Sequence, residues 1–457
     1  MNQNGGIHKG GFAVLCHRNG GSESPGILML EQIRCKKARS LIEEELRGHL
    51  EEQIEENWMS GMEPEEAEKA AVLDMGDPVQ TGISLDGIHR PQISWRLVIL
   101  VGAVSLLSIV LQMASGLSQN PAGGIAGGLD HSLYVIFGFA LMLIVYRMDY
   151  SFLGRNALWV TLGFILMLLF LRILSMPING TYIWLSIGNV SISLGALLYL
   201  WPPLYGALLY RYYGQGYKGV AKCFLWTLFP LWYAWTFPDI GLAFVIFFVS
   251  MILLSLGIIQ GWFRIKKGMT LAVIWGASIL LPAFYLLWGV FFHGFEAYQM
   301  ERLTVYLRGE NRAVSMLAGS RWFGKGAEMD VAKAVEYNSD YILSYLCSCY
   351  GILAAVFIAV LVLGLIFAAI KIAGKGKNRF GKMIGFASGL SLLLPAGINV
   401  LVNLGLIPGM NTFLPFLSKG NSYLLVSYIL LGLMLSVYRY KNILSEKACR
   451  KAKPAVK

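Results

Sequence analysis

Long apolar windows without charge alternate with short polar or charged segments from about residue 97 onward. A helix of about 20 apolar residues crosses the hydrocarbon core of a bilayer, and within lipid each backbone amide must find its partner inside its own segment. Each window therefore predicts a membrane-spanning helix. Pro202 and Pro203 interrupt the fourth window and the fifth is short. The ten predicted spans are 97–117, 131–146, 156–175, 187–210, 220–236, 240–262, 269–292, 341–370, 383–404 and 421–438.

Lysine and arginine recur in alternate loops between these windows. They follow the second, fourth, sixth and eighth predicted spans, whereas the short intervening loops hold almost none. Short loops rich in basic residues stay on the cytoplasmic side. We therefore expect a membrane domain over 96–440 with both termini in the cytoplasm, followed by a basic cytoplasmic tail over 441–457. The one long outer connection is 293–340, and long loops of this kind are commonly functional.

The first 95 residues follow a different pattern. Residues 1–28 are rich in glycine and polar residues, which indicates a disordered leader or an over-extended translation start with Met29 as the true beginning. Further along, apolar side chains recur at three- and four-residue steps among many glutamates, and Gly61, Pro64 and Gly76-Asp-Pro78 mark helix boundaries. We expect a small cytoplasmic helical domain over 29–95.

The composition agrees with a membrane protein. Hydrophobic residues make up 56% of the 457 residues and charged residues only 14%, which is too apolar for a soluble chain of this length. The predicted fold class is all-α, a polytopic membrane protein with about ten transmembrane helices and a small N-terminal helical domain. The net charge of +11 follows from the basic loops and suits anionic lipid headgroups, so nucleic acid is not expected as a partner.

Patterns for metal and nucleotide binding are missing from the sequence. The six cysteines show no paired metal spacing, and the six histidines form no ligand pair. Gly324-Lys-Gly326 lacks the strand-to-helix context that a nucleotide loop requires. No protein metal site is expected, and an ATP-driven pump is disfavoured.

The N-terminal domain resembles the permease prefix domain that precedes several bacterial membrane-protein families. The resemblance rests on Glu44-Glu-Leu-Arg-Gly-His-Leu50, Met62-Glu-Pro-Glu-Glu-Ala-Glu68, Met75-Gly-Asp-Pro78 and Ile88-His-Arg-Pro91. It implies a regulatory or interaction module and no chemistry.

The membrane domain resembles the FtsW/RodA/SpoVE (SEDS) family of bacterial cell-wall synthesis. Six motifs occur in the family's order and on the predicted outer face. They are Asn179-Gly180 with Trp184, Pro238-Asp-Ile-Gly241, Tyr298 with Arg302, Gly324-Lys-Gly326, Tyr337-Asn-Ser-Asp-Tyr-Ile342 ahead of Gly351, and Gly405-Leu-Ile-Pro-Gly-Met410 with Leu414-Pro-Phe-Leu-Ser-Lys-Gly-Asn-Ser422.

This resemblance implies peptidoglycan synthesis at the bacterial plasma membrane, for cell division, cell shape or sporulation. Members polymerise glycan strands from lipid II, an undecaprenyl-linked disaccharide, usually with a class B penicillin-binding protein and other divisome or elongasome components. The transfer needs a general base for the attacking hydroxyl and cationic help for the departing pyrophosphate. A divalent cation such as Mg²⁺ is therefore the one cofactor that the chemistry suggests.

The resemblance also implies site residues. Typical members carry an Asp-Pro in the outer loop, whose aspartate is the proposed base, but residues 302–313 hold no Asp-Pro here. Glu310 and Asp340 are the candidate catalytic residues, although Asp340 could instead cap a helix. Asp239 has the same alternative as an N-cap. The substrate-binding candidates are Arg302, Lys325, Asp239, Ser418 and Asn421.

Three functions remain open from the sequence. The first is a divergent glycan polymerase that uses Glu310 or Asp340. The second is a non-catalytic relative that binds lipid II or a wall-synthesis partner and is regulated through the prefix-like domain. The third is a transporter of a lipid-linked solute, suggested by broken helices expected near Pro395 and Pro408.

Overall fold

The computed structural model describes residues 25–119, 121–175, 183–187, 190–237, 239–292, 297–308, 312–326 and 339–444. These residues form two compact units. Unit 1 comprises 25–93, 376–378 and 439–444, and unit 2 comprises 94–375 and 379–438.

Unit 1 contains α2 (Pro25–Glu31), α3 (Lys36–Met59), α4 (Pro64–Asp74) and α5 (Pro78–His89). The sequence sets the ends of these helices. Proline stands in the first turn of α4 and α5, where its missing amide proton leaves no bond unmade. Gly61 and Gly76 adopt positive φ angles of 98° and 73° in the turns before those prolines. Leu50 of α3 and Ala71 of α4 form the buried contact between the two helices.

α2 packs closely against α5. A Cβ added at Gly82 would lie 2.6 Å from the carbonyl oxygen of Met29, so the approach depends on the missing side chain. α2 begins at Pro25, and residues 25–28 are therefore helical although the sequence placed them in a leader. The rest of that predicted leader, 1–24, lies outside the described residues.

The segment after the last membrane helix also belongs to unit 1. The amide of Gln92 donates to the carbonyl oxygen of Arg439 (3.2 Å), and the side chain of Asn442 donates to the carbonyl oxygen of Ile88 (3.0 Å). The chain therefore leaves unit 1 near residue 94 and returns to it at residue 439. Such a return requires an even number of membrane crossings between these two points.

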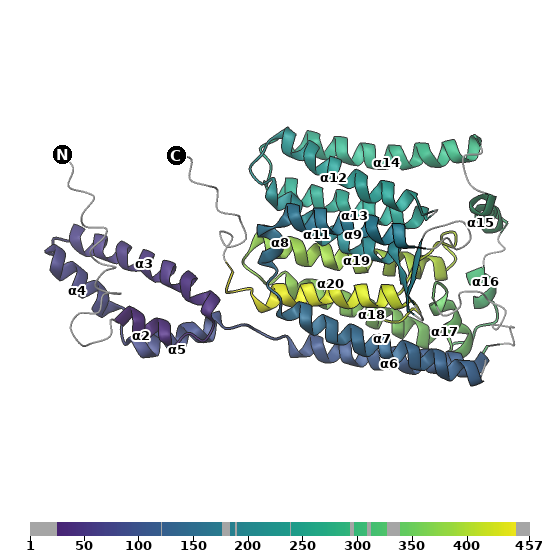
Figure 1. Cartoon of the computed structure of the whole chain (residues 1–457), viewed down its shortest axis with the longest axis horizontal. Helices are drawn as coiled ribbons and strands as arrows, with labels where there is room; N and C mark the ends of the chain where they lie inside the picture. Colours follow the sequence, from purple (N-terminus) through teal and green to yellow (C-terminus); the bar gives the residue numbers. More distant parts are fainter. Residues whose placement is uncertain are drawn as a thin grey trace. The chain divides into compact units, whose positions relative to one another are not determined.

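Unit 2 is a bundle of long helices that run side by side (Figure 1). Among the described residues, eight helices are long and apolar enough to cross a membrane. The chain is thus a multi-pass, essentially all-α membrane protein, which confirms the predicted fold class. These eight are α6 (Trp95–Gln119), α7 (Pro121–Arg147), α9 (Ala157–Leu174), α13 (Ile240–Ile259), α14 (Lys267–Phe291), α18 (Ile352–Ala373), α19 (Arg379–Asn403) and α20 (Asn421–Arg439).

Shorter or less apolar elements complete unit 2. α12 corresponds to the fifth predicted span, but it carries two lysines and an internal proline and is not among the eight. The elements are α8 (Ser151–Arg155), β1 (Trp184–Ile187), β2 (Val190–Ser193), α10 (Leu194–Leu197), the 3₁₀ helix η2 (Leu198–Leu200), α11 (Trp201–Arg211), α12 (Tyr217–Trp235), α15 (Ala297–Leu307), α16 (Arg312–Leu317) and α17 (Ile342–Tyr350).

The fourth predicted span, 187–210, is wrong at its start. β1 and β2 form an antiparallel hairpin in which Trp184 pairs with Ser193 and Ile187 with Val190. The second strand, Val-Ser-Ile-Ser, alternates serine with large apolar residues, a period-2 pattern that a hydropathy window averages into an apolar run. The helical part starts only at Leu194. The two prolines that interrupt the window lie in the first turn of α11, where proline is tolerated.

The eighth predicted span, 341–370, is two helices and not one. Gly351 separates α17 from α18 with φ 98°, a conformation that favours glycine. The backbone of 321–324 fills the break: the amide of Gly324 donates to the carbonyl oxygen of Tyr350 (3.1 Å), and the amide of Ile352 to that of Arg321 (2.9 Å). Hydropathy cannot detect such a break because both flanking segments are apolar.

Burial differs strongly between the spans. About two thirds of the apolar window is buried in α13 (61%), α19 (61%) and α20 (67%), whereas α14 has 11% of its window buried and contacts mainly α13. Close packing in the centre depends on small residues. A Cβ at Gly389 would lie 2.3 Å from Ile370, and one at Gly432 would lie 2.8 Å from the carbonyl oxygen of Met142.

The basic loops meet at one end of unit 2. The amide of Gly214 donates to the carbonyl oxygen of Trp262 (2.7 Å), which joins the loop after α11 to the loop after α13. The ring of Tyr150, after α7, stacks on Phe380 at the start of α19, with centroids 5.9 Å apart. The loops predicted to share a membrane face therefore lie together.

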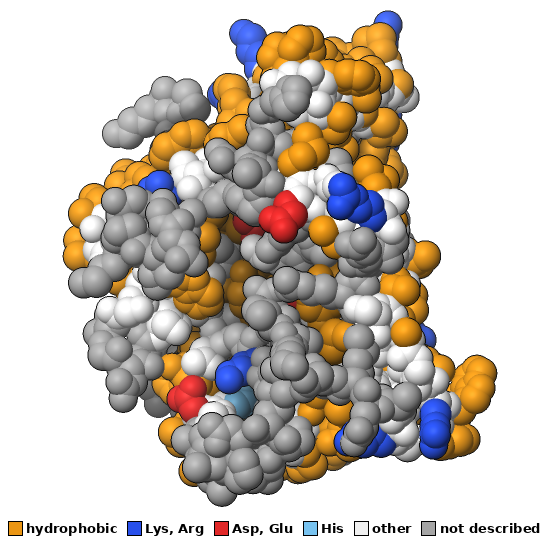
Figure 2. All heavy atoms as spheres, turned by 90° about the vertical axis from the view of Figure 1, so that its right-hand side faces the viewer, with side chains coloured by type: hydrophobic (Ala, Val, Ile, Leu, Met, Phe, Trp, Pro, Cys, Tyr) orange, Lys and Arg blue, Asp and Glu red, His pale blue; other side chains and the backbone are white. Residues whose placement is uncertain are grey.

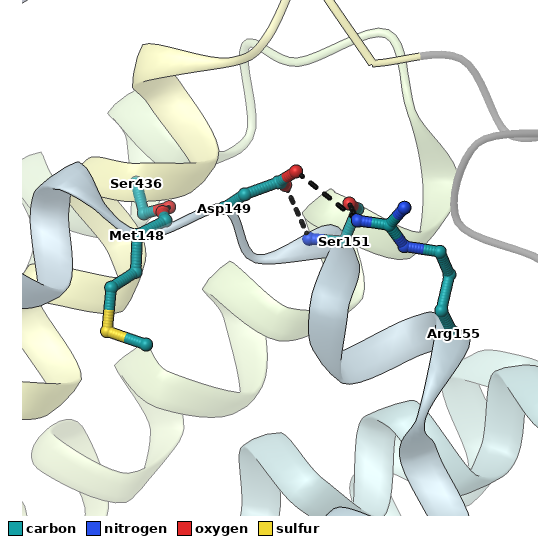
Figure 3. A network of polar contacts seen from close by, with 5 residues as sticks. All are labelled: Met148, Asp149, Ser151, Arg155 and Ser436. Carbon is teal, nitrogen blue, oxygen red and sulfur yellow. Dashed lines mark hydrogen bonds and ion pairs between the residues drawn. The ribbon is translucent and has the colours of Figure 1, made fainter. Parts of the chain in front are cut away.

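A polar turn joins α7 to α8 at this end (Figure 3). Asp149 accepts a hydrogen bond from the amide of Ser151 (2.8 Å) and lies 3.6 Å from the guanidinium of Arg155. Ser436 of α20 donates to the carbonyl oxygen of Met148 (2.6 Å). These contacts tie the turn to the end of α20.

Candidate functional site

The opposite end of unit 2 gathers the segments that carry the predicted site residues. The closing loop, residues 404–420 between α19 and α20, is their centre. Tyr306 of α15 donates to the carbonyl oxygen of Leu406 (2.8 Å), and Ser422 accepts from the amide of Ser193 in the hairpin (2.8 Å). Figure 2 shows this end, where the charged side chains of the described residues lie apart from one another among apolar and uncharged ones.

Two buried asparagines of α19 hold Asp340 in place. Asn399 donates to the carbonyl oxygen of Asp340 (2.9 Å) and to the hydroxyl of Thr412 (2.8 Å). Asn403, one turn later, donates to the same Asp340 oxygen (2.8 Å). Both asparagines are at most 3% exposed, so these bonds lie in a region of low dielectric where an unmade bond is costly. We call this arrangement the asparagine clamp.

The clamp also supplies the cap of α17. The side-chain oxygen of Asn403 accepts from the amide (2.9 Å) and the hydroxyl (2.9 Å) of Ser344, in the first turn of α17. First-turn amides have no partner within their own helix. The N-cap residue of α17, Tyr341, makes no side-chain cap bond. A residue of α19 therefore supplies a capping acceptor to the first turn of α17.

Asp239 is an N-cap. Its Oδ1 accepts from the amide of Leu242 in the first turn of α13 (3.0 Å), and its Oδ2 accepts from the side chain of Asn411 (3.4 Å). The alternative prediction that Asp239 caps the helix that follows it is confirmed. The second contact ties the start of α13 to the closing loop.

The structure brings Asp239 and Asp340 to the same aromatic group. Both carboxylates lie within electrostatic range of the phenols of Tyr199 and Tyr423. These two rings pack against each other (centroids 6.1 Å apart) and against Phe413 of the closing loop (5.1 and 4.6 Å). Two carboxylates from distant segments are thus in electrostatic range of one pair of packed phenols, of which Tyr199 is buried and Tyr423 partly buried.

Ser418 has a positioning role within the closing loop. Its buried hydroxyl donates to the carbonyl oxygen of Ser339 (2.8 Å) and accepts from the amide of Leu414 (2.8 Å). It therefore fixes both the loop and the residue that precedes Asp340. Asn421 opens α20 and is partly exposed. Substrate contacts of Ser418 and Asn421 stay predictions.

One residue of the closing loop holds an unusual backbone conformation. Phe416 has φ 68°, the one positive φ outside glycine among the described residues. Its ring is 2% exposed and packs edge-on against Tyr428 at 5.2 Å, and Tyr428 hydrogen-bonds Ser105 (2.5 Å). Such strain persists where surrounding packing fixes it and is concentrated at functional sites.

Lys325 lies away from Asp340, and the side chain of Arg302 is not among those that the structure describes. Lys325 is exposed and within electrostatic range of Cys349, at the opposite end of α17 from Asp340. The nine residues of α17 separate them by about 13 Å at 1.5 Å per residue. Arg302 lies in α15 one turn before Tyr306, and its side chain is not among those described. Neither residue is placed in the group around Asp340.

Several predicted positions lie outside the described residues. Glu310 is among them, as are the motif positions 179–180, 238 and 337–338. Within the described part of the chain, no group of three or more His, Cys, Asp and Glu side chains could hold a metal ion.

Sequence reasoning missed the residues that build the site. Asn399, Asn403, Tyr199 and Tyr423 carry most of the contacts, yet no motif singled them out. A signal existed for two of them: Asn399 and Asn403 are four residues apart in a long apolar helix, and polar side chains inside such helices usually have a structural or functional partner.

The comparisons now identify the family. The FtsW/RodA/SpoVE family of cell cycle proteins matches residues 90–443, which is most of the chain. The chain belongs to this family. The match covers unit 2 and confirms the family resemblance of the membrane domain. Residues 1–89, which precede unit 2, lie outside the match. The permease prefix resemblance of unit 1 stays a prediction.

Curated relatives are probable FtsW peptidoglycan glycosyltransferases. The protein of Hydrogenovibrio crunogenus is 32% identical over 156 residues, which cover 31% of this chain and 40% of that protein. The protein of Geobacter sp. (strain M18) is 33% identical over 155 residues, with 31% and 42% covered. The matched part of this chain spans about half the length of these relatives or less.

Solved structures share the fold over a larger part. A chain of a peptidoglycan synthase complex superposes with a TM-score of 0.60 at 21% identity, covering 76% of this chain and 98% of that one. The rod shape determining protein RodA of Thermus thermophilus gives a TM-score of 0.54 at 19% identity, covering 76% and 97%. At these identities the likeness establishes the fold.

Proposed function

We propose that this FtsW/RodA/SpoVE member acts in bacterial cell-wall synthesis as a divergent glycan polymerase that uses lipid II. The observation that carries the proposal is the group around Asp340. The asparagine clamp holds the backbone of Asp340, and its carboxylate lies within electrostatic range of two phenols that are also in range of Asp239. A carboxylate on a fixed backbone, at the end of the bundle opposite the basic loops, suits a donor whose lipid stays in the bilayer while its sugars lie outside it.

Asp340 is the candidate base from the sequence that lies among the described residues, whereas Glu310 lies outside them. A general base must offer an oxygen to the proton it removes. Both oxygens of Asp239 accept hydrogen bonds, from Leu242 and Asn411. The asparagine clamp holds Asp340 through its backbone carbonyl oxygen. In this proposal Asp340 takes the proton of the attacking sugar hydroxyl, and Mg²⁺ held partly by substrate phosphates stabilises the leaving pyrophosphate.

The proposal includes a location and a partner. Loops rich in lysine and arginine lie together at one end of unit 2, and such loops remain cytoplasmic. Both termini would then be cytoplasmic at the bacterial plasma membrane. A class B penicillin-binding protein is the proposed partner, because a structurally similar chain belongs to a peptidoglycan synthase complex.

A polymerisation assay tests the proposal. Purified full-length protein, alone and with a co-expressed class B penicillin-binding protein, is incubated with lipid II and Mg²⁺, and the glycan chains are separated by gel electrophoresis. We expect polymer from the wild type and a loss of 10²-fold or more for Asp340→Asn, the scale of general base catalysis. Asp149→Asn, at the opposite end of the bundle, is the matched control and should remain active.

The same assay distinguishes the polymerase from a second candidate function, a protein that only binds lipid II. Residues 302–313 hold no Asp-Pro, which favours a relative that binds lipid II without polymerising it. Saturable lipid II binding with no polymer in either arm would establish that function. Polymer formation by Asp340→Asn at the wild-type rate would instead show that another residue is the base, with Glu310→Gln as the next variant.

The third function suggested by the sequence loses part of its support. α19 runs without interruption from Arg379 to Asn403 although Pro395 lies inside it, so the helix expected to break there is continuous. The break that does occur, at Gly351, is filled by the backbone of 321–324. A transporter is therefore not proposed.

A further inference from the structure

The N-terminal helices of unit 1 carry an exposed acidic face in an otherwise basic protein. Between residues 25 and 93, Asp and Glu are about twice as numerous as Lys and Arg, whereas the whole chain has a net charge of +11. Glu45, Glu52 and Glu56 of α3 follow one another at seven- and four-residue steps and are all exposed. These spacings place the three carboxylates on one side of the helix, and we call them the acidic stripe.

The chain's own C-terminal segment already reaches the start of this stripe. Lys37, at the beginning of α3, lies 5.4 Å from the ring centroid of Tyr440. Asn442 donates to the carbonyl oxygen of Ile88, and the neighbouring His89 has its Nε2 3.9 Å from a carboxylate oxygen of Glu45. Ile443 is 2% exposed. Residues 440–443 are therefore packed in unit 1 against the end of α5, whose last residue, His89, lies next to Glu45.

The sequence beyond this point is basic. Residues 445–457 contain Lys447, Arg450, Lys451, Lys453 and Lys457 against a single Glu446. From Leu444 to Lys453 an extended chain covers about 30 Å. The acidic stripe from Glu45 to Glu56 is about 16 Å long at the helical rise. The basic residues can therefore reach the whole stripe.

We propose that the basic segment 445–457 docks along the acidic stripe of α3. Opposite charges attract the two surfaces, and the packed anchor at Tyr440 and Ile443 makes the encounter intramolecular, which raises the effective concentration of the segment to the millimolar range. An anionic lipid surface competes for the same lysines but repels the stripe. The docking is independent of the activity proposed above.

The experiment is a disulfide cross-link in the full-length protein. Cys449 lies in the basic segment, and His49→Cys places a thiol on the stripe between Glu45 and Glu52. The remaining cysteines are replaced by serine, and the protein is held in nanodiscs that contain anionic lipid. Gln80→Cys, an exposed position on α5, is the matched control. We expect the His49→Cys protein to cross-link at least tenfold faster than the Gln80→Cys protein in low salt.

The second arm of the experiment tests whether the docking depends on charge. With Lys447, Arg450 and Lys451 each changed to Glu, or in 1 M salt, the rate at His49→Cys should fall to that of the control, because exposed charges are screened over about 3 Å at this ionic strength. Equal rates at the two positions in low salt would overturn the proposal in favour of the membrane surface. A fast cross-link that persists after charge reversal would overturn its electrostatic basis.

Discussion

Removal of the Asn403 amide should destabilise the site by a calculable amount. Asn403→Leu keeps a similar volume but removes both the donor and the acceptor of the side chain. The amide of Ser344 then has no cap acceptor in a buried first turn, and an unsatisfied buried backbone group costs about 1–3 kcal/mol. The carbonyl oxygen of Asp340 keeps its bond from Asn399, so the loss of its second bond adds less to the destabilisation. The expected loss is about 2–3 kcal/mol.

Thermal unfolding of the purified full-length protein measures this loss, and hydrogen exchange locates it. We expect Asn403→Leu to lower Tm by several degrees and to increase exchange of the amides at 342–346. Asn411→Leu is the control, because that side chain is exposed and makes one long bond to Asp239 (3.4 Å), so its effect should stay within about 0.5 kcal/mol. Equal Tm values for the two variants would refute the capping role of Asn403.

Three further predictions concern packing. Gly351→Ala puts a Cβ 2.7 Å from the carbonyl oxygen of Trp322 at a positive φ, so protease cleavage within 318–326 should become faster, whereas Gly364→Ala, with no atom within 4 Å, should leave it unchanged. Phe416→Ala removes a buried ring and should lower the unfolding free energy by about 3–5 kcal/mol, with Phe416→Leu losing clearly less; equal losses would contradict the packing argument. Gly82→Ala should increase hydrogen exchange in α2 and Gly87→Ala should not, since only the first meets the backbone of α2.

Periodicity and charge predicted most of the membrane architecture. Among the described residues, eight predicted spans contain helices long and apolar enough to cross a membrane, and the loops predicted to share a face are joined by contacts such as Gly214 with Trp262. Two predictions failed for one physical reason. A hydropathy window averages over position, so it cannot distinguish the alternating hairpin at 184–193 from a helix, nor detect the helix break at Gly351.

The candidate site could be predicted only in part. The sequence motifs pointed to Asp239, Asp340 and the closing loop, and the structure places these three together. The roles of residues within the site depend on contacts between residues that are far apart in the sequence. Asp340 and Asn403 are 63 residues apart, so no local pattern could show that an asparagine of α19 caps α17 and holds Asp340.

The sequence by itself determined that this chain crosses a membrane many times as helices, because each span must satisfy its own backbone in lipid, and its ordered motifs indicated the FtsW/RodA/SpoVE family. Only the tertiary structure decided that the side chain of Asp239 caps α13 and that asparagines of α19 hold the backbone of Asp340. These roles depend on donors from segments that meet only in the folded bundle.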